Sequence, residues 1–237
     1  MSKILLVLLP GLDGTGCLFN DFVATLPPGL DPIVVRYSTD TPLGYAKLEE
    51  IARASIPRNS PFVLLGESFS GPIAISIAAS KPTGLIGLIL SCTFARYPRN
   101  LFRRCYWLAP YLPVSGPAVI AARRVISPER VEPTVAAKLN AAREMVAKKV
   151  FRARIGELLR VDVTALLGEI DVPILDLRAM QDGIVPNRAG DEIRKRGQQV
   201  RAIDMEGPHF LLQAKPTEAA EAINEFVSDI AHARGGQ

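Results

Sequence analysis

Cysteine and histidine are scarce in this sequence, which has three cysteines and two histidines among 237 residues. Cys17, Cys92 and Cys105 are odd in number and irregularly spaced, which argues against a disulfide framework and fits a reducing cytosol. No cysteine and histidine stand at the spacing of zinc ligands, and no motif implies an organic cofactor. We therefore predict a cytoplasmic protein that needs neither a metal nor another cofactor.

Long apolar runs are also absent. The N-terminal run covers only residues 4–9 before Pro10 and Gly11 follow, which is too short for the core of a typical signal peptide. No run approaches the roughly 20 apolar residues that a membrane-spanning helix needs. Apolar residues nevertheless make up 48% of the chain, which excludes a disordered or fibrous protein and suits one large domain with its own core.

Charge is unevenly distributed, although the net charge is only +4. Residues 95–160 contain 14 basic and 4 acidic side chains, whereas the rest of the chain contains 14 and 20. The simplest interpretation is a helical segment with a solvated basic face. The alternative is attraction of an anionic substrate, such as an acidic acyl carrier or a coenzyme A ester. No recognition motif accompanies the charge, so we expect no nucleic-acid partner.

Short apolar runs alternate with helical patterns along most of the chain. The runs are rich in Val, Ile and Leu without polar alternation, which is typical of parallel strands buried on both faces. Helical patterns cover residues 45–56 and 70–80 and the stretch after Pro216. We predict an α/β protein with a mainly parallel, doubly wound sheet of six strands, at residues 4–9, 32–37, 62–66, 85–92, 173–178 and 200–205.

The alternation stops after Thr93 and resumes near Asp171. The interval has a helical pattern broken by several prolines. We predict a core domain of residues 1–94 and 165–237, with residues 95–164 inserted as a helical cap.

A candidate nucleophile lies in residues 64–71, which read LLGESFSG. Ser68 falls between a predicted buried strand and a predicted buried helix. Such a turn projects the serine hydroxyl above the sheet and leaves the next backbone N–H free at the start of the helix. The alternative is that Ser68 is a buried capping residue.

A candidate acid and a candidate base follow later strands. Asp182 stands in an Asp-Gly loop after the strand predicted at residues 173–178, where an ordinary turn is the other interpretation. His209 lies in a Gly-Pro loop between the last strand and the last helix. An imidazole with a pKa of about 6.5 can take a serine proton near neutral pH and return it to a leaving group.

Together these segments resemble the α/β-hydrolase family, in which Ser, Asp and His follow in this order, each after a strand. The resemblance implies that Ser68 is the nucleophile, Asp182 the acid and His209 the base. It covers residues 3–94 and 165–235 but not the predicted cap. Ser70 replaces the second glycine of the family's Gly-x-Ser-x-Gly turn. Because serine is small and Gly71 follows, we expect the turn to form.

A glycine-rich loop, LPGLDGTG, occupies residues 9–16 directly after the first predicted strand. It lacks the lysine of a P-loop and does not match a dinucleotide fingerprint. By the family resemblance, the N–H groups of Leu12 and Phe69 would form an oxyanion hole, with Pro10 where the family often has histidine. The wording of the loop also looks like that of plant phytyl ester synthase-like acyltransferases.

The resemblance implies cleavage of a small-molecule carboxylic ester through an acyl-enzyme. A thioesterase or carrier-ester hydrolase, acyl transfer to an alcohol, and a non-catalytic receptor on the same scaffold are the alternatives. The chain starts at the strand before the glycine-rich loop, so an exposed sheet edge could be covered by a second copy in a homodimer. Aromatic residues of the predicted cap form either its own core or an apolar substrate pocket: Phe102, Tyr106, Trp107 and Tyr111.

Overall fold

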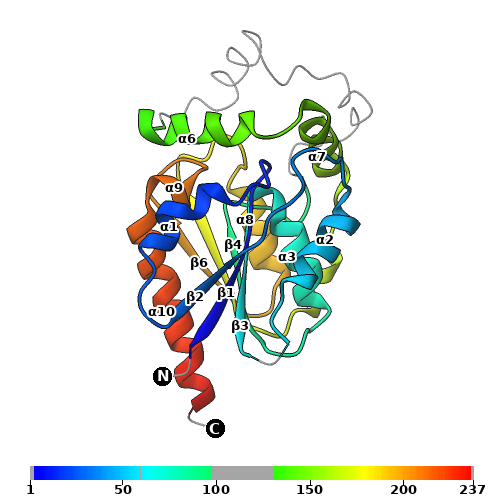
Figure 1. The fold of residues 1–237 in the computed structure, drawn as a ribbon. Coiled ribbons are helices and arrows are strands. Elements are labelled where there is room, and N and C mark those ends of the chain that lie inside the picture. The colour runs from blue at the N-terminus through cyan, green and yellow to red at the C-terminus, as the bar shows by residue number, and fades with distance from the viewer. Residues whose placement is uncertain (1–2, 59, 98–130, 236–237) are drawn as a thin grey trace.

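The computed structural model describes residues 3–58, 60–97 and 131–235 (Figure 1). Six strands form one sheet in the order β2-β1-β3-β4-β5-β6, and every neighbouring pair is parallel. This confirms the predicted parallel sheet. The strands are β1 (Ile4–Leu9), β2 (Leu30–Val34), β3 (Phe62–Glu67), β4 (Leu85–Ser91), β5 (Ile174–Ala179) and β6 (Val200–Met205).

Helices cover both faces of the sheet, as buried apolar strands require (Figure 1). One face packs against α2 (Tyr45–Ala54), α3 (Gly71–Ala79) and α8 (Arg188–Arg196) and against the 3₁₀ segment η4 (Thr164–Glu169). The other face packs against α1 (Asn20–Ala24), α9 (Leu211–Ala214) and α10 (Pro216–Gly235). The shorter helices α1, α8 and α9 were not predicted individually.

The strand at the β2 edge differs from its prediction. We expected residues 32–37, whereas β2 spans Leu30–Val34 and pairs in register from Ile4 opposite Leu30. Gly29, at φ +105°, turns the chain into the strand and sets this earlier start. The residues predicted beyond Val34 still hydrogen-bond to another part of the chain, because the Tyr37 N–H donates to the Gly14 carbonyl at 2.8 Å.

Two helices lie between β4 and β5, α6 (Pro133–Glu144) and α7 (Lys148–Arg160). The start of β1 lies at the opposite end of the sheet from α6, so α6 crosses the carboxyl ends of the parallel strands (Figure 1). An isolated bridge joins Arg96 to Asp162 where the segment leaves and rejoins the sheet region. Among the described residues, no helix is both long and apolar enough to cross a membrane.

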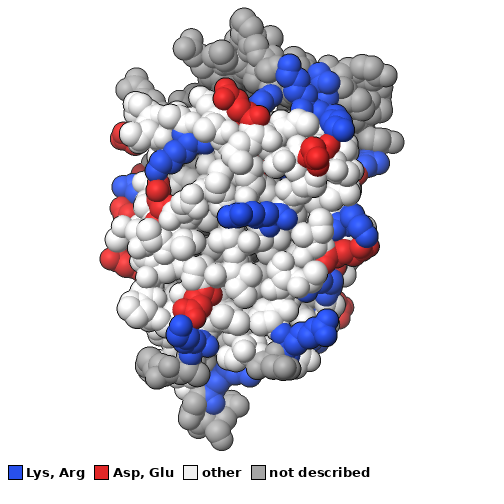
Figure 2. All heavy atoms as spheres, in the orientation of Figure 1, with Lys and Arg blue, Asp and Glu red and all other residues white. Residues whose placement is uncertain are grey.

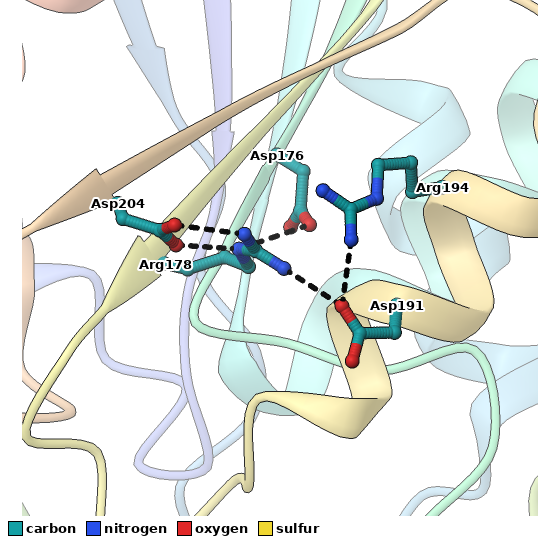
Figure 3. A network of polar contacts seen from close by, with 5 residues as sticks. All are labelled: Asp176, Arg178, Asp191, Arg194 and Asp204. Atoms are coloured by element: carbon teal, nitrogen blue, oxygen red, sulfur yellow. Dashed lines mark hydrogen bonds and ion pairs between the residues drawn. The ribbon is translucent and has the colours of Figure 1, made fainter.

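A cluster of charged residues lies where β5, β6 and α8 meet (Figure 3). Arg178 makes two hydrogen bonds to Asp204, at 2.7 and 2.9 Å, and one of 3.2 Å to Asp191. Asp176, which is 1% exposed, lies 4.0 Å from the same guanidinium. Gly190 permits this packing, because a Cβ there would stand 2.7 Å from an Asp176 oxygen.

Candidate active site

The site begins where β1 and β3 pair side by side, with Leu9 opposite Gly66. The strand order reverses here, because β2 lies on one side of β1 and the later strands lie on the other. The loops that follow β1 and β3 therefore meet at the carboxyl edge of the sheet, where ligands bind in open α/β folds.

Ser68 follows β3 directly and has a left-handed backbone, with φ +48°. This conformation is uncommon for a residue with a side chain and is typical of strained functional turns. The turn continues through the 3₁₀ segment η2 (Ser68–Ser70) into α3. The Thr93 hydroxyl donates to the Ser68 carbonyl and fixes the turn from the neighbouring strand end.

Two glycines let α3 approach the turn. A Cβ on Gly66 would stand 2.7 Å from Ala74 Cβ and 3.0 Å from the Ser70 carbonyl oxygen. A Cβ on Gly71 would stand 1.9 Å from Thr93 Oγ1. Ser70, which stands where the family has its second glycine, is fully buried. Its hydroxyl donates to the Pro10 carbonyl and lies 3.1 Å from the Tyr37 hydroxyl.

The structure brings Ser68, His209 and Asp182 together from three separate loops. Ser68 Oγ lies 2.8 Å from His209 Nε2, and His209 Nδ1 lies 2.7 Å from Asp182 Oδ2. A carboxylate can only accept, so Nδ1 carries the proton toward Asp182. In the neutral imidazole, Nε2 is then left to accept the proton of the Ser68 hydroxyl.

The loop after β5 holds the Asp182 carboxylate in a fixed orientation. Its second oxygen, Oδ1, accepts the N–H groups of Ile184 at 2.8 Å and Val185 at 2.7 Å. The side chains of Asp182 and His209 are 3% and 4% exposed, so their hydrogen bond is shielded from water. A shielded pair of opposite charges is stronger than an exposed one once the imidazole is protonated.

The glycine-rich loop lies beside Ser68, since a Cβ on Gly11 would stand 4.0 Å from Ser68 Cβ. Asp13 Oδ2 accepts the Thr15 N–H at 2.9 Å, which is a turn-forming role. The Leu12 N–H has no hydrogen-bond partner in the part of the chain that the structure describes. Leu12 and Phe69, the two predicted oxyanion residues, thus lie on neighbouring loops next to Ser68.

Glu67 contacts the glycine-rich loop and helix α9. It is 5% exposed and accepts a hydrogen bond of 2.9 Å from Gln213 Nε2 and another from the Gly11 N–H. Burial is the main reason that its pKa rises to about 7. Its carboxylate supports the backbone of the glycine-rich loop.

Some predicted site residues lie outside the described part of the chain. They are the four aromatics proposed to line the substrate pocket: Phe102, Tyr106, Trp107 and Tyr111. Other residues that contact the site were not predicted, namely Tyr45 and Arg154. Helical periodicity marks both only as members of helices, and no local motif indicates which loop they reach.

The fold and the arrangement of the three side chains can now be compared with known proteins. No protein-family model matches the sequence, and no curated protein matches it. Solved structures do match. A lipase-esterase related protein from Clostridium acetobutylicum is similar with a TM-score of 0.79 and 15% identity, over 95% of each chain.

Two further solved structures extend this similarity. An esterase from Exiguobacterium antarcticum has a TM-score of 0.80 and 15% identity, over 96% of this chain and 92% of its own. A proline iminopeptidase from Mycobacterium smegmatis has a TM-score of 0.71 and 18% identity, over 98% of this chain and 91% of its own. The chain therefore has the α/β-hydrolase fold, as predicted. Because such different activities occur on this fold, the chemistry must be argued from the site.

Proposed function

We propose that this protein is a serine hydrolase that cleaves carboxylic esters through an acyl-enzyme intermediate. The observation that carries the proposal is the hydrogen-bonded chain from Ser68 Oγ through the His209 ring to Asp182, with distances of 2.8 and 2.7 Å. A nucleophile, a base and an orienting carboxylate in this sequence of contacts form the arrangement required for acyl transfer. The fold of the similar esterase structures agrees with it.

In the first half of the proposed reaction, Ser68 Oγ attacks the ester carbonyl carbon while His209 Nε2 takes the hydroxyl proton. The carbonyl electrons move onto oxygen, and the N–H groups of Leu12 and Phe69 stabilise that oxyanion. When the tetrahedral intermediate collapses, the bond to the alcohol breaks and His209 gives its proton to the leaving oxygen.

In the second half, a water molecule attacks the acyl-serine ester and loses its proton to His209. Collapse of the second tetrahedral intermediate releases the carboxylic acid and returns the proton to Ser68 Oγ. Asp182 stays ionised throughout and stabilises the imidazolium. The proposed steps use only these side chains, the two backbone N–H groups and water.

A fluorophosphonate probe tests the proposal directly. The probe should form an adduct on Ser68, located by peptide mass spectrometry, and p-nitrophenyl esters should be hydrolysed with a chain-length preference. Ser68→Ala should abolish both signals. Ser80→Ala, which changes an exposed serine at the end of α3, is the matched control and should keep both. A folded wild-type protein without an adduct would favour the non-catalytic receptor instead.

A second part of the proposal concerns the leaving group of the substrate, which could be a neutral alcohol or an anionic thiol. Lys and Arg side chains gather at the end of the molecule where α7 lies, whereas both signs are scattered elsewhere on this face (Figure 2). This distribution favours an anionic thioester, such as an acyl-coenzyme A or acyl-carrier substrate, over a neutral one. Hydrolysis of butyryl-coenzyme A and butyryl-pantetheine at rising salt tests it. A salt-dependent preference for the coenzyme A ester is expected, and equal rates would exclude the idea.

Acyl transfer to an alcohol uses the same three side chains and differs only in the second acceptor. Product analysis with added alcohol separates it from hydrolysis, because transfer gives a new ester instead of the free acid. We also propose that residues 95–164 form the cap over this site.

A further inference from the structure

Helix α7 carries a buried arginine that contacts the glycine-rich loop. Arg154 is 1% exposed, and its Nη1 donates to the carbonyl oxygens of Leu12, at 3.0 Å, and Asp13, at 2.5 Å. Its Nη2 donates to the Ser38 carbonyl at 2.8 Å. Among the described residues, no carboxylate lies within ion-pair distance of it. The guanidinium is therefore committed to backbone carbonyls.

The loop is shaped to receive this side chain. Gly14 has φ +69°, and a Cβ there would stand 2.5 Å from Arg154 Nη1. The ring centre of Tyr37 lies 5.8 Å from the guanidinium carbon on another side. A lysine ammonium, which is a single point of charge, could not reach the three carbonyls as a planar fork does.

These contacts surround the peptide group that carries the Leu12 N–H. The carbonyl of that peptide, Gly11 O, accepts the Gly14 N–H at 3.0 Å, which sets the direction of the N–H on its other side. Glu67 holds the preceding N–H, and Arg154 holds the two carbonyls that follow. With its neighbours fixed, this peptide has little freedom to rotate.

The same helix reaches Phe69 through Tyr45. Glu157 Oε2 accepts the Tyr45 N–H at 3.0 Å at the start of α2. The Tyr45 hydroxyl donates to the Phe69 carbonyl at 2.8 Å. The two rings stack with their centres 4.7 Å apart. The peptide that carries the Phe69 N–H is held on both sides, because its own carbonyl, Ser68 O, accepts the Thr93 hydroxyl and the next carbonyl accepts the Tyr45 hydroxyl. Leu12 is thus tied to α7 by Arg154, and Phe69 by Tyr45 together with Glu157.

We propose that Arg154 and Tyr45 are positioning residues that hold the N–H groups of Leu12 and Phe69 toward the oxyanion formed at Ser68. This inference rests on the proposed function. Donors held in place before the reaction need no reorganisation when charge develops, and that is the source of their effect on the rate. The part of the chain that contains α7 has few sequence motifs. In this proposal, α7 is nevertheless required for turnover.

The first experiment compares Arg154→Met with Lys195→Met, a matched control that removes an exposed cation from α8. We expect kcat of Arg154→Met on the best p-nitrophenyl ester to fall about 10²-fold or more, with KM changed only a few-fold. The control should match the wild type. A folded Arg154→Met protein with wild-type kcat would overturn the proposal.

The inhibition constant of butylboronic acid separates positioning of the oxyanion hole from a general structural role of Arg154. Butylboronic acid binds Ser68 Oγ as a tetrahedral adduct, whose boron-bound oxygen occupies the place of the oxyanion. Its inhibition constant should rise by about the same factor as kcat falls, and the apparent pKa of the pH–rate profile should stay unchanged, because His209 and Asp182 lie on other loops. Loss of activity with unchanged boronate affinity, or with a shifted profile, would contradict positioning of the oxyanion hole.

If Arg154→Met does not fold, Tyr45→Phe decides, because it removes one hydroxyl and keeps the stacked ring. Its kcat and boronate affinity should fall together, about tenfold, and no change would overturn the proposal for Phe69.

Arg154→Ala assayed with added guanidinium tests the direct contact. Recovery of activity with guanidinium supports the contact, whereas equal recovery with the same concentration of NaCl contradicts it. If Ser68→Ala is as active as the wild type, the proposed function itself has failed. If it is inactive while the α7 variants are normal, only this inference has failed.

Discussion

At the scale of single residues, the distances among Ser68, His209 and Asp182 depend on a few backbone hydrogen bonds. Asp182 is fixed by two N–H groups of its own loop, and Ser68 by the strained turn after β3. Because these side chains are short, small shifts of the loop backbone would move Ser68, His209 and Asp182 out of hydrogen-bond distance. This explains why polar neighbours such as Thr93 and Ser70 are buried around the turn.

Asp182→Asn tests the role of the carboxylate at this scale. The Ile184 and Val185 N–H groups need an oxygen acceptor, so the new amide would keep its carbonyl toward them and turn its NH2 toward His209 Nδ1. Nδ1 would then accept, and the imidazole proton would lie on Nε2. The imidazole could then no longer accept the Ser68 proton. We expect kcat for p-nitrophenyl esters to fall about 10³- to 10⁴-fold with the fold intact by circular dichroism. Activity within tenfold of the wild type would place the acid elsewhere.

At the scale of elements, the unit β3, η2 and α3 is built around close backbone contacts. Pro72 stands in the first turn of α3, where its missing N–H costs nothing. Gly66 lets that helix pack directly on the strand end. Because α3 is apolar on all sides, it is buried against the sheet.

Gly66→Ala should destabilise this unit. Its Cβ would meet Ala74 at 2.7 Å and the Ser70 carbonyl at 3.0 Å, and neither is the end of a flexible side chain. We expect a loss of about 1–3 kcal/mol of unfolding free energy in urea, together with lower activity. Gly168→Ala is the control, because its nearest contact is 3.9 Å away, and it should stay within about 0.5 kcal/mol of the wild type. Equal effects at both positions would contradict the packing argument.

At the scale of the whole molecule, two buried carboxyls link stability to pH. Burial raises the pKa of Asp176 to about 6 and that of Glu67 to about 7. Well below their ordinary pKa values of 3.8 and 4.5, both carboxyls are protonated in the folded and the unfolded chain. As pH rises, the unfolded chain ionises first, so each group lowers stability until its folded pKa is passed.

Asp176→Asn should therefore gain stability relative to the wild type between about pH 4 and pH 6, and no more above that range. A shift of about two pKa units corresponds to a gain of up to about 3 kcal/mol. Urea unfolding at half-unit pH steps measures it. Ser80→Ala, which removes no titratable group, should give a difference that does not change with pH in this window. A flat difference for Asp176→Asn would mean that its carboxyl is not buried as described.

The sequence by itself determined the sheet, because strands buried on both faces must be continuous apolar runs. It also predicted Ser68, Asp182 and His209, since each sits in a short local context after a strand. The cap boundaries, the homodimer, the cytoplasmic location and the pocket aromatics stay predictions.

Only the tertiary structure decided what surrounds the site. Arg154 lies 142 residues after Leu12, and Tyr45 reaches Phe69 from another helix. Their helices are recognised by periodicity, but periodicity does not say which loop a side chain will meet. Such contacts depend on how helices are placed against the sheet, which is set by packing over the whole core and not by any local pattern of residues.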